Sequence, residues 1–332
     1  RHNRLEKKIM LEQAKKILIK NPLIKKVNAG LKKVRKEKRR LTKKYVFEDR
    51  RKRSRYACLI LAGYKEELWD NVFARITAYV PEDVDVCIVS SGVYSKRLSE
   101  IAQKNCWSYV STKANKITLA LNMAISLMSE AEYIYKLDED MFITKEFFES
   151  VRNKYFQIEK EKKYVISFAA PLIPVNTYGY VRLLEIFHRE EEWQKKFGTI
   201  TYTNGLDHHC EILKDPESAR FMWGECREFQ DIDLLSEKLA ARSNAYSICP
   251  IRFSIGAIFF KRDYWNDMGM LDVSEGNNLG YDEYQMCTYG MDHGMVIAVD
   301  ENCVVGHLAY GPQTKEMLEY YREHNERFVC KK

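Results

Sequence analysis

Two carboxylates stand two residues apart in the segment YIYKLDEDMFI (133–143), where Asp138 and Asp140 follow a hydrophobic run. Residues i and i+2 point to the same side of an extended chain, so both carboxylates are expected to face one ligand. Carboxylate oxygens suit Mg²⁺ and Mn²⁺, ions that also bridge to diphosphates. The alternative is a polar turn that caps a helix starting near Thr144, but Thr144 and Phe147 lack the Glu of a capping box. The segment therefore predicts a divalent-metal site.

The region around these carboxylates alternates short apolar runs with helical patterns. Ser90-Ser91-Gly92 is expected to end the second of the apolar runs. The spacing predicts strands at 57–62, 85–89, 107–110 and 133–137, and helices at 66–80, 95–104 and 117–128. Strand–helix–strand order with short turns predicts a parallel, right-handed α/β sheet. Ligands bind such sheets beyond the carboxyl ends of the strands, where Asp138 and Asp140 are expected to lie.

Several other kinds of site are disfavoured. No G-x-G-x-x-G follows the first predicted strand and no G-x-x-x-x-G-K-[ST] occurs, which argues against dinucleotide oxidoreductases and P-loop enzymes. The 9 cysteines form no C-x-x-C pair, so we expect buried free thiols in a reducing, cytoplasmic compartment. His208-His209 diverge on any regular element, and we interpret them as acceptor-side structure rather than a metal pair.

Charge divides the 332 residues near position 55. Residues 1–55 carry 23 Lys and Arg against 5 Asp and Glu, whereas residues 56–332 carry 31 against 42. The basic part has apolar residues at approximate helical spacing, interrupted at Asn21-Pro22, and predicts two basic amphipathic helices. The sequence contains no run of about 20 apolar residues, so no membrane-spanning helix is predicted.

This basic arm has three interpretations. Attachment to an anionic membrane surface, as a peripheral protein at the inner face of the cell membrane, is the first. Packing on a second subunit, which would make the protein a homo-oligomer, is the alternative. Nucleic acid is disfavoured, because the arm offers little aromatic surface to stack on bases.

From Tyr56 to about His307, the chain resembles GT-A glycosyltransferases, most closely the inverting enzymes of family 2. The segment KANKITLALNMAISLMSEAEYIYKLDED (113–140) follows the order of that family's donor-side motifs. The resemblance implies a D-x-D motif at Asp138 and Asp140 that binds a divalent metal and the diphosphate of a nucleotide sugar. It assigns the other donor-side positions to Ala62, Ser90, Lys116 and Asn122. Ser90-Ser91 stands where the family usually has an acidic residue that contacts the base.

A second block carries the acceptor side of this resemblance. The segment 253–272 resembles the family's strand, basic hairpin and Gly-rich turn, and the segment 279–308 its Glu-Asp helix, turn, strand and terminal histidine. The match implies that Asp282 is the catalytic base, with Glu283 as its rival. It makes His307 a further metal ligand, which suits Mn²⁺ better than Mg²⁺. An N-cap role of Asp282, for a helix beginning at Glu283, is the structural alternative.

Together these features predict an α/β fold of GT-A type and a division into three parts. They are a basic helical arm (1–55), a transferase domain (56–310, with its donor half at 56–144 and acceptor half at 145–310) and a C-terminal helix (311–332). The resemblance implies transfer of a sugar from a nucleotide-sugar donor, a UDP-sugar above all, to a glycan or lipid-linked glycan, with inversion, in polysaccharide biosynthesis. The alternatives are a sugar nucleotidyltransferase, for which LAGYKEE (61–67) is a poor Gly-rich loop, and a non-catalytic membrane-associated adaptor.

Overall fold

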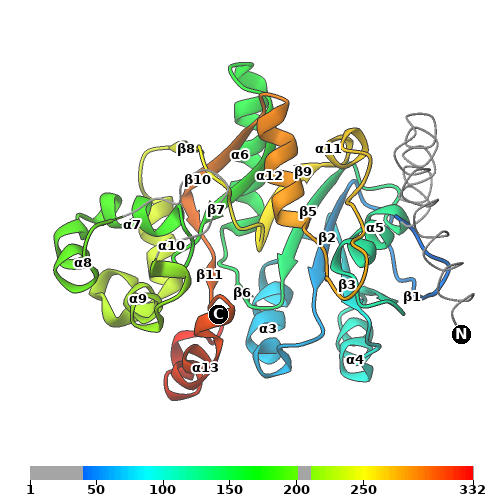
Figure 1. The fold of residues 1–332 in the computed structure, drawn as a ribbon, viewed down its shortest axis with the longest axis horizontal. Helices are drawn as coiled ribbons and strands as arrows, with labels where there is room; N and C mark the ends of the chain where they lie inside the picture. The colour runs from blue at the N-terminus through cyan, green and yellow to red at the C-terminus, as the bar shows by residue number, and fades with distance from the viewer. Residues whose placement is uncertain (1–39, 201–210, 332) are drawn as a thin grey trace, which may run out of the picture.

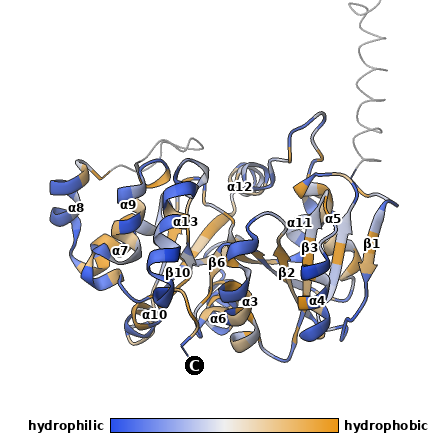
Figure 2. Cartoon of the chain, turned by 90° about the horizontal axis from the view of Figure 1, so that it is seen from below, coloured by the Kyte–Doolittle hydropathy of each residue, from blue (hydrophilic) through white to orange (hydrophobic). Residues whose placement is uncertain are grey.

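The computed structural model describes residues 40–200 and 211–331, which form a nine-stranded sheet with helices on both faces (Figures 1 and 2). The strands of this sheet run in the order β1-β4-β3-β2-β5-β9-β7-β10-β8, and β6 and β11 form a separate pair. The strands are β1 Tyr45–Glu48, β2 Tyr56–Leu61, β3 Val84–Ser91, β4 Ser108–Thr112, β5 Tyr133–Asp138, β6 Met141–Phe142, β7 Ile166–Leu172, β8 Tyr246–Cys249, β9 Ala257–Lys261, β10 Val296–Val304 and β11 Gly306–His307. The helices are α3 Trp69–Tyr79, α4 Lys96–Lys104, α5 Ile117–Leu127, α6 Phe147–Glu161, α7 Gly179–Phe187, α8 Glu190–Phe197, α9 Pro216–Arg220, α10 Ile232–Ala240, α11 Arg262–Asp267, α12 Asp282–Asp292 and α13 Thr314–Glu323. The α/β class predicted from the sequence is confirmed.

The first half of the sheet has the predicted parallel order. β2 pairs in parallel with β3 on one side and with β5 on the other, and β3 pairs in parallel with β4. The chain thus moves outward from β2 to β3 and β4, then returns through α5 to β5. The direction reverses between β2 and β5, and in open α/β sheets the crevice at such a reversal is where ligands bind.

The strand β3 is buried along its whole length. All eight residues of β3 are buried, as expected for a parallel strand covered by helices on both faces. Ser90 and Ser91, expected to end the strand, belong to it and pair with Ser111 and Thr112 of β4. The helix that follows begins where predicted, because the Ser95 side chain accepts a hydrogen bond from the Leu98 amide as its N-cap.

The second half of the sheet is mixed rather than parallel. β9 runs antiparallel to β5 and β7, β8 runs antiparallel to β10, and β7 pairs in parallel with β10. Antiparallel neighbours need no helical crossover, so β9 can join β5 directly although the two are far apart in sequence. The basic hairpin expected after this strand is absent, because Lys261 leads straight into α11.

The small β6–β11 pair links the middle of the chain to its end. Gly306 pairs with Phe142, and His307 pairs with Met141. The Trp223 indole N–H donates to the His307 carbonyl at 2.6 Å and fixes the pair from the side. This pairing places His307 beside the acidic residues at the end of β5.

The described part of the predicted arm is not helical. Within residues 40–55, β1 forms the edge of the sheet and runs antiparallel to β4. The Asp85 carboxylate accepts hydrogen bonds from the Lys52 and Ser54 amides at 2.7 and 2.8 Å, which ties the segment after β1 to β3. The two amphipathic helices predicted from residues 1–39 lie outside the described residues, as do His208 and His209.

Two other predicted helix boundaries differ from the structure. The helix expected near Thr144 begins at Phe147, because the Thr144 hydroxyl bonds the Val304 carbonyl at 2.8 Å instead of capping. The C-terminal helix ends at Glu323, and the chain after it is held by buried Arg75, which donates to the Phe328 and Val329 carbonyls, both at 3.0 Å. Among the described residues, no helix is long and apolar enough to cross a membrane.

Candidate active site

The predicted acidic residues line a pocket at the reversal between β2 and β5. The pocket has a volume of about 340 Å³ and lies at the carboxyl ends of β2, β3 and β5. Its lining residues are Leu61, Ala62, Tyr64, Lys65, Ser91, Ile117, Lys136, Asp138, Glu139, Asp140, Ser254, Ile255, Leu279, Asp282, Glu283, His307, Ala309, Tyr310 and Gly311. The structure therefore brings together Asp138, Asp140, Asp282, Glu283 and His307 from three distant parts of the sequence.

Each of the two aspartates faces a lysine. The Lys136 ammonium, on β5 itself, lies 2.6 Å from the Asp138 carboxylate and also donates to the Ile255 carbonyl at 3.0 Å. The Lys65 ammonium, on the loop after β2, donates to Oδ2 of Asp140. The pocket floor is thus an array of alternating positive and negative charges rather than a purely acidic patch.

The acid between them points elsewhere and has a structural role. Glu139 accepts hydrogen bonds from the Gly63 amide at 2.9 Å, the Tyr64 amide at 3.1 Å and the Trp69 indole N–H at 2.7 Å. These contacts hold the loop after β2, including Lys65, against the end of β5. The alternation along the acidic triplet thus separates two ligand-facing carboxylates from one that positions the loop.

His307 is oriented by its backbone neighbours. Its Nδ1 lies 3.2 Å from the buried Val175 carbonyl, and Nε2 lies 3.2 Å from Oδ2 of Asp140. A ring nitrogen that faces a carbonyl oxygen must carry the proton, so Nε2 is the atom left for Asp140 or a metal. Gly306 permits this placement, because a Cβ at that position would lie 2.2 Å from the Trp223 ring.

The two aspartates differ in acidity. Burial raises the pKa of Asp138 to about 6, only partly offset by Lys136, although 32% of its side chain remains accessible. Burial also opposes ionisation of Asp140, but its interactions with His307 and Lys65 outweigh burial and hold the pKa of Asp140 well below its usual value. Asp140 is therefore the carboxylate that stays charged at all physiological pH values.

The first two residues of α12, Asp282 and Glu283, also line the pocket. Glu283 is bound to the Arg252 guanidinium at 2.5 Å. Asp282 is half-buried and has no hydrogen bond or ion pair to another described residue. It is not the N-cap, because the helix begins at Asp282 itself and Tyr281 occupies the cap position. Asp282 is therefore the carboxylate here that is available to take a proton.

Three of the predicted donor-side residues do not line the pocket. The Ser90 hydroxyl turns into the core, bonded to the Val93 carbonyl at 2.6 Å and the Tyr109 hydroxyl at 2.8 Å; its neighbour Ser91 lines the pocket instead. Asn122 is fully buried and bonds the Leu271 backbone and the Trp265 indole. The alternation of β3 and the burial of α5 account for these two positions.

Lys116 is the third, and it holds a loop. Its ammonium donates to the Gly276 carbonyl at 2.5 Å and to the Asn278 carbonyl. Ala62 does line the pocket, at the end of β2. The backbone amide of Ala62 donates to Val89 of β3, so its place in the pocket follows from sheet pairing.

Sequence reasoning missed the two lysines, and of the Ser90-Ser91 pair it assigned Ser90 to the donor site although Ser91 lines the pocket. Lys65 follows the first strand and Lys136 lies two residues before Asp138, so both had a positional signal: each is next to the strand end at which ligands bind. A lysine inside an apolar strand, as in YIYKLD, is costly unless paired, which is the clue that Lys136 has a charged neighbour.

The donor atoms fit a divalent metal that arrives together with a diphosphate. Among residues 40–200 and 211–331, no group of three or more His, Cys, Asp and Glu side chains could hold a metal by itself. Asp140 and His307 supply one carboxylate and one imidazole to a shared point. Mg²⁺ and Mn²⁺ in nucleotide sites commonly take one or two protein ligands and complete their shell with phosphate oxygens and water.

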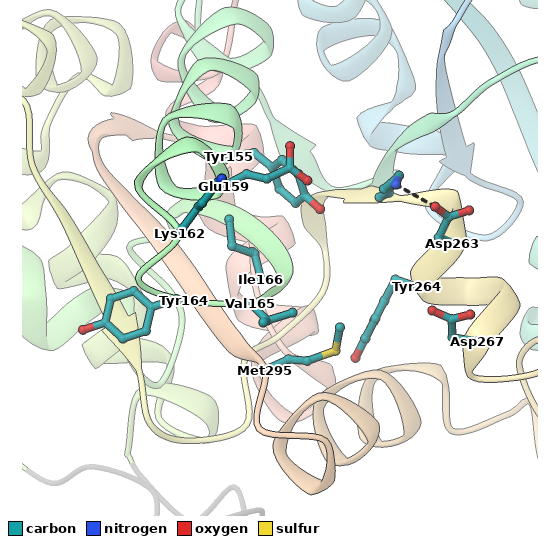
Figure 3. Close-up of a pocket in the computed structure, with 11 residues that line it drawn as sticks. Tyr155, Glu159, Lys162, Tyr164, Val165, Ile166, Asp263, Tyr264, Asp267 and Met295 are labelled. Carbon is teal, nitrogen blue, oxygen red and sulfur yellow. Dashed lines mark ion pairs between the residues drawn. The ribbon is translucent and has the colours of Figure 1, made fainter.

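A cavity of similar size lies at the opposite edge of the sheet (Figure 3). Its volume is about 360 Å³, and Val165 and Met295 place it at the edge where β7 and β10 begin. Its ion pair joins Lys261, the last residue of β9, and Asp263, the second residue of α11, 2.6 Å apart. Glu159, Asp263 and Asp267 line this cavity, but none of its lining residues is a histidine, so the carboxylate pocket is the better candidate.

Comparison with known proteins identifies no family to which the chain belongs. No protein-family model matches the chain, and no curated protein does. Among solved structures, it is similar to GalNAc-T7 with UDP, GalNAc and Mn²⁺, at 12% identity and a TM-score of 0.44, over 80% of this chain and 47% of that chain. It is also similar to the mannosyltransferase PcManGT from Pyrobaculum calidifontis in complex with GDP-Man and Mn²⁺, at 13% identity and a TM-score of 0.44, over 91% of this chain and 71% of that chain. The chain spans about half the length of the first of these proteins.

Proposed function

We propose that the protein is a metal-dependent glycosyltransferase of GT-A type, which transfers a sugar from a nucleotide-sugar donor to a hydroxyl group of a glycan acceptor. One observation carries the proposal: the Asp140–His307 pair and the available Asp282 carboxylate face one pocket, at the sheet position where α/β proteins bind nucleotides. The resemblance of segments 113–140 and 279–308 to inverting family 2 enzymes supports the same function.

The donor diphosphate would lie over the end of β5. Asp140 and His307, with Asp138 beside them, would hold Mn²⁺ or Mg²⁺, which neutralises the charge that develops on the leaving diphosphate. Lys65 and Lys136 add two ammonium groups at the same place. Ala62 and Ser91, at the ends of β2 and β3, would contact the nucleoside, whose identity the Ser90-Ser91 pair leaves open.

The acceptor would approach from the side of α12. Its hydroxyl oxygen forms the new bond to the anomeric carbon while the bond from that carbon to the diphosphate oxygen breaks. The hydroxyl proton passes to Asp282, and the nucleoside diphosphate leaves. The resemblance to inverting family 2 enzymes implies that the acceptor attacks the face opposite the leaving diphosphate, which would give inversion.

The function is tested by following release of the nucleoside diphosphate. The full chain is incubated with UDP-, GDP-, CMP- and dTDP-sugars and Mn²⁺, with simple sugars or water as acceptor. We expect turnover with one donor, and a loss of about 10²–10⁴-fold in kcat for Asp282→Asn. Glu283→Gln should lose less, and Asp267→Asn, in the cavity of Figure 3, should match the wild type. No turnover with any donor, or full activity of Asp282→Asn, would contradict the proposal.

The basic end of the chain fits a membrane-bound acceptor. Exposed Leu41, Tyr45 and Val46 lie beside Lys43 and Lys44 at the edge of the sheet, a combination of apolar and basic groups that suits an anionic bilayer surface. The full chain should sediment with vesicles that contain phosphatidylserine and dissociate at high salt, and Lys43→Glu/Lys44→Glu should bind more weakly. Equal binding to neutral vesicles would argue against this role.

A further inference from the structure

A larger groove runs along the outer side of α12. Its volume is about 800 Å³, and its lining residues come from α12 and from the chain between α11 and α12. The residues that line it are Met268, Asp272, Val273, Ser274, Glu275, Asn278, Tyr281, Tyr284, Gln285, Thr288, Tyr289 and Asp292. No residue of this groove has a role in the catalytic steps proposed above.

The groove follows one face of the helix. Tyr281, Gln285, Thr288 and Asp292 recur at intervals of three and four residues, which places them on one side of α12. Met286, Cys287 and Gly290 occupy the other side and are buried in the core. The helix has 11 residues and therefore spans about 16 Å, enough for a short oligosaccharide rather than a single sugar.

The other wall of the groove is the loop 273–279, which is held in place by hydrogen bonds. The Lys116 ammonium bonds the Gly276 and Asn278 carbonyls, and the Ser274 hydroxyl bonds the Asn278 carbonyl at 2.5 Å. The Leu279 carbonyl accepts a hydrogen bond from the Ile117 amide at 2.8 Å, which anchors the loop to the start of α5. Lys116 thus shapes the groove although it does not line the catalytic pocket.

The chemistry of the lining suits an uncharged, hydroxyl-rich chain. The Tyr281 and Tyr284 side chains are 63% and 44% exposed, and their rings offer flat apolar faces for the C–H faces of sugars. Asp292 supplies carboxylate oxygens for hydroxyl groups. The Asn278 and Gln285 amides already bond Gly280, Tyr281, Asp272 and Met270, and each keeps a second N–H for a sugar hydroxyl. Thr288 Oγ1 is buried and has no hydrogen-bond partner among the described residues. None of the described lining residues is Lys or Arg, which disfavours nucleic acid and lipid phosphates.

The groove and the catalytic pocket are lined by neighbouring residues of one segment, 278–284. Leu279, Asp282 and Glu283 line the pocket, while Asn278, Tyr281 and Tyr284 line the groove. Arg252 connects the two, because it pairs with Glu283 and lies 5.8 Å from the centre of the Tyr284 ring. A chain whose terminal hydroxyl reaches Asp282 would therefore continue onto the tyrosines.

We propose that this groove is a subsite for the sugar chain of the acceptor, which selects an oligosaccharide over a monosaccharide. The inference rests on the proposed glycosyl transfer and extends it to the class of acceptor. The basic arm of residues 1–39 is the competing occupant, because it would match the carboxylates of Asp272, Glu275 and Asp292. Continuity with Asp282 and the two exposed rings favour the sugar chain.

Binding to a glycan array, without any donor, tests the subsite apart from transfer. The full-length wild type, the double variant Tyr281→Ala/Tyr284→Ala and the control Tyr94→Ala are applied to neutral and acidic oligosaccharides of one to six sugars. We expect affinity for one neutral series to rise with chain length in the wild type and in Tyr94→Ala, whose ring is 50% exposed at the other end of the sheet. The double variant should lose roughly tenfold or more and show no dependence on length.

Binding of nucleotide sugars with Mn²⁺ is measured on the same three proteins. An unchanged nucleotide affinity together with lost glycan binding in the double variant supports the subsite. Nucleotide binding by the wild type without binding of any glycan overturns the subsite and leaves the proposed function standing. Absence of nucleotide binding overturns the proposed function itself. Preferential binding of a synthetic peptide of residues 1–39, lost in the double variant, overturns the subsite in favour of the arm.

Discussion

At the scale of single residues, the three acids at 138–140 have different roles because their side chains point in different directions. Asp138 and Asp140 face the pocket and its lysines, whereas Glu139 turns to the loop after β2. Three neighbouring carboxylates can coexist because each has a positively polarised partner: two ammonium groups and a set of N–H donors. Their proximity in sequence therefore does not imply a common role.

Glu139→Ala should destabilise the protein. It removes the acceptor for the Gly63 and Tyr64 amides and the Trp69 indole N–H, and buried donors left unpaired cost about 1–3 kcal/mol each. We expect the free energy of unfolding to fall by about 3 kcal/mol in urea titration. Glu149→Ala, an exposed site on α6, serves as the control and should change it by under about 0.5 kcal/mol. Equal effects of the two changes would refute the role of Glu139.

At the scale of elements, the β6–β11 pair assembles the site. It joins Met141 to His307 and so sets the separation of His307 from Asp140. Trp223 supports the pair by its bond to the His307 carbonyl. The fit between Trp223 and Gly306 leaves no room for a side chain at that position.

Gly306→Ala tests this support. The added Cβ would lie 2.2 Å from the Trp223 ring, so the ring or β11 must move. Overpacking of this kind costs about 1–3 kcal/mol, and displacement of His307 should also weaken binding of Mn²⁺ with a nucleotide. Gly311→Ala is the stability control, since its Cβ would meet no atom within 4 Å. An unchanged free energy of unfolding in Gly306→Ala would show that the close contact with Trp223 does not require glycine at this position.

Besides its pairing with β4, the edge strand β1 is attached through the Glu48 carboxylate, which makes part of this attachment sensitive to pH. Glu48 accepts hydrogen bonds from Arg50 at 2.8 Å, Tyr94 at 2.9 Å and Ser99 at 2.7 Å. Burial opposes ionisation, but these three donors together outweigh it and lower the pKa of Glu48 from its usual 4.5. A lowered pKa in the folded state stabilises the protein above about pH 4.5, and this contribution is lost as the pH falls through the lowered pKa.

Glu48→Gln should therefore cost about 1–2 kcal/mol of unfolding free energy at pH 7. The difference from the wild type should shrink in acid, because the wild-type carboxyl then becomes neutral as well. Urea titrations across the acid range measure both effects, with Glu100→Gln on α4 as a control at an exposed site. A difference that stays constant with pH would exclude Glu48 as the titrating group.

At the scale of the whole molecule, local sequence patterns predicted the elements of the donor half. They could not predict the parts of the site that depend on contacts between residues far apart in the sequence. Alternating runs located β2 to β5 and α3 to α5 within a few residues, and strand order then placed Asp138 and Asp140 at a ligand-binding edge. The order of the motifs does not show which side chains face the core and which face the pocket. Ser90 and Asn122 were therefore expected in the donor site, although both side chains are buried in the core. The tyrosine groove depends on a loop clamped by Lys116, a contact across more than 150 positions that no local pattern encodes.

The central claim is that the carboxylate pocket binds a nucleoside diphosphate together with a metal. Thermal unfolding with UDP-, GDP-, CMP- and dTDP-sugars, each with and without Mn²⁺, tests it most directly, with Asp140→Asn beside the wild type. A ligand at about 100 times its dissociation constant adds roughly 2.7 kcal/mol to the free energy of unfolding. We predict that one nucleotide stabilises the wild type only with Mn²⁺, that Mn²⁺ alone has little effect, and that Asp140→Asn shows no shift. Stabilisation by no nucleotide, or equal stabilisation of Asp140→Asn, would contradict the account.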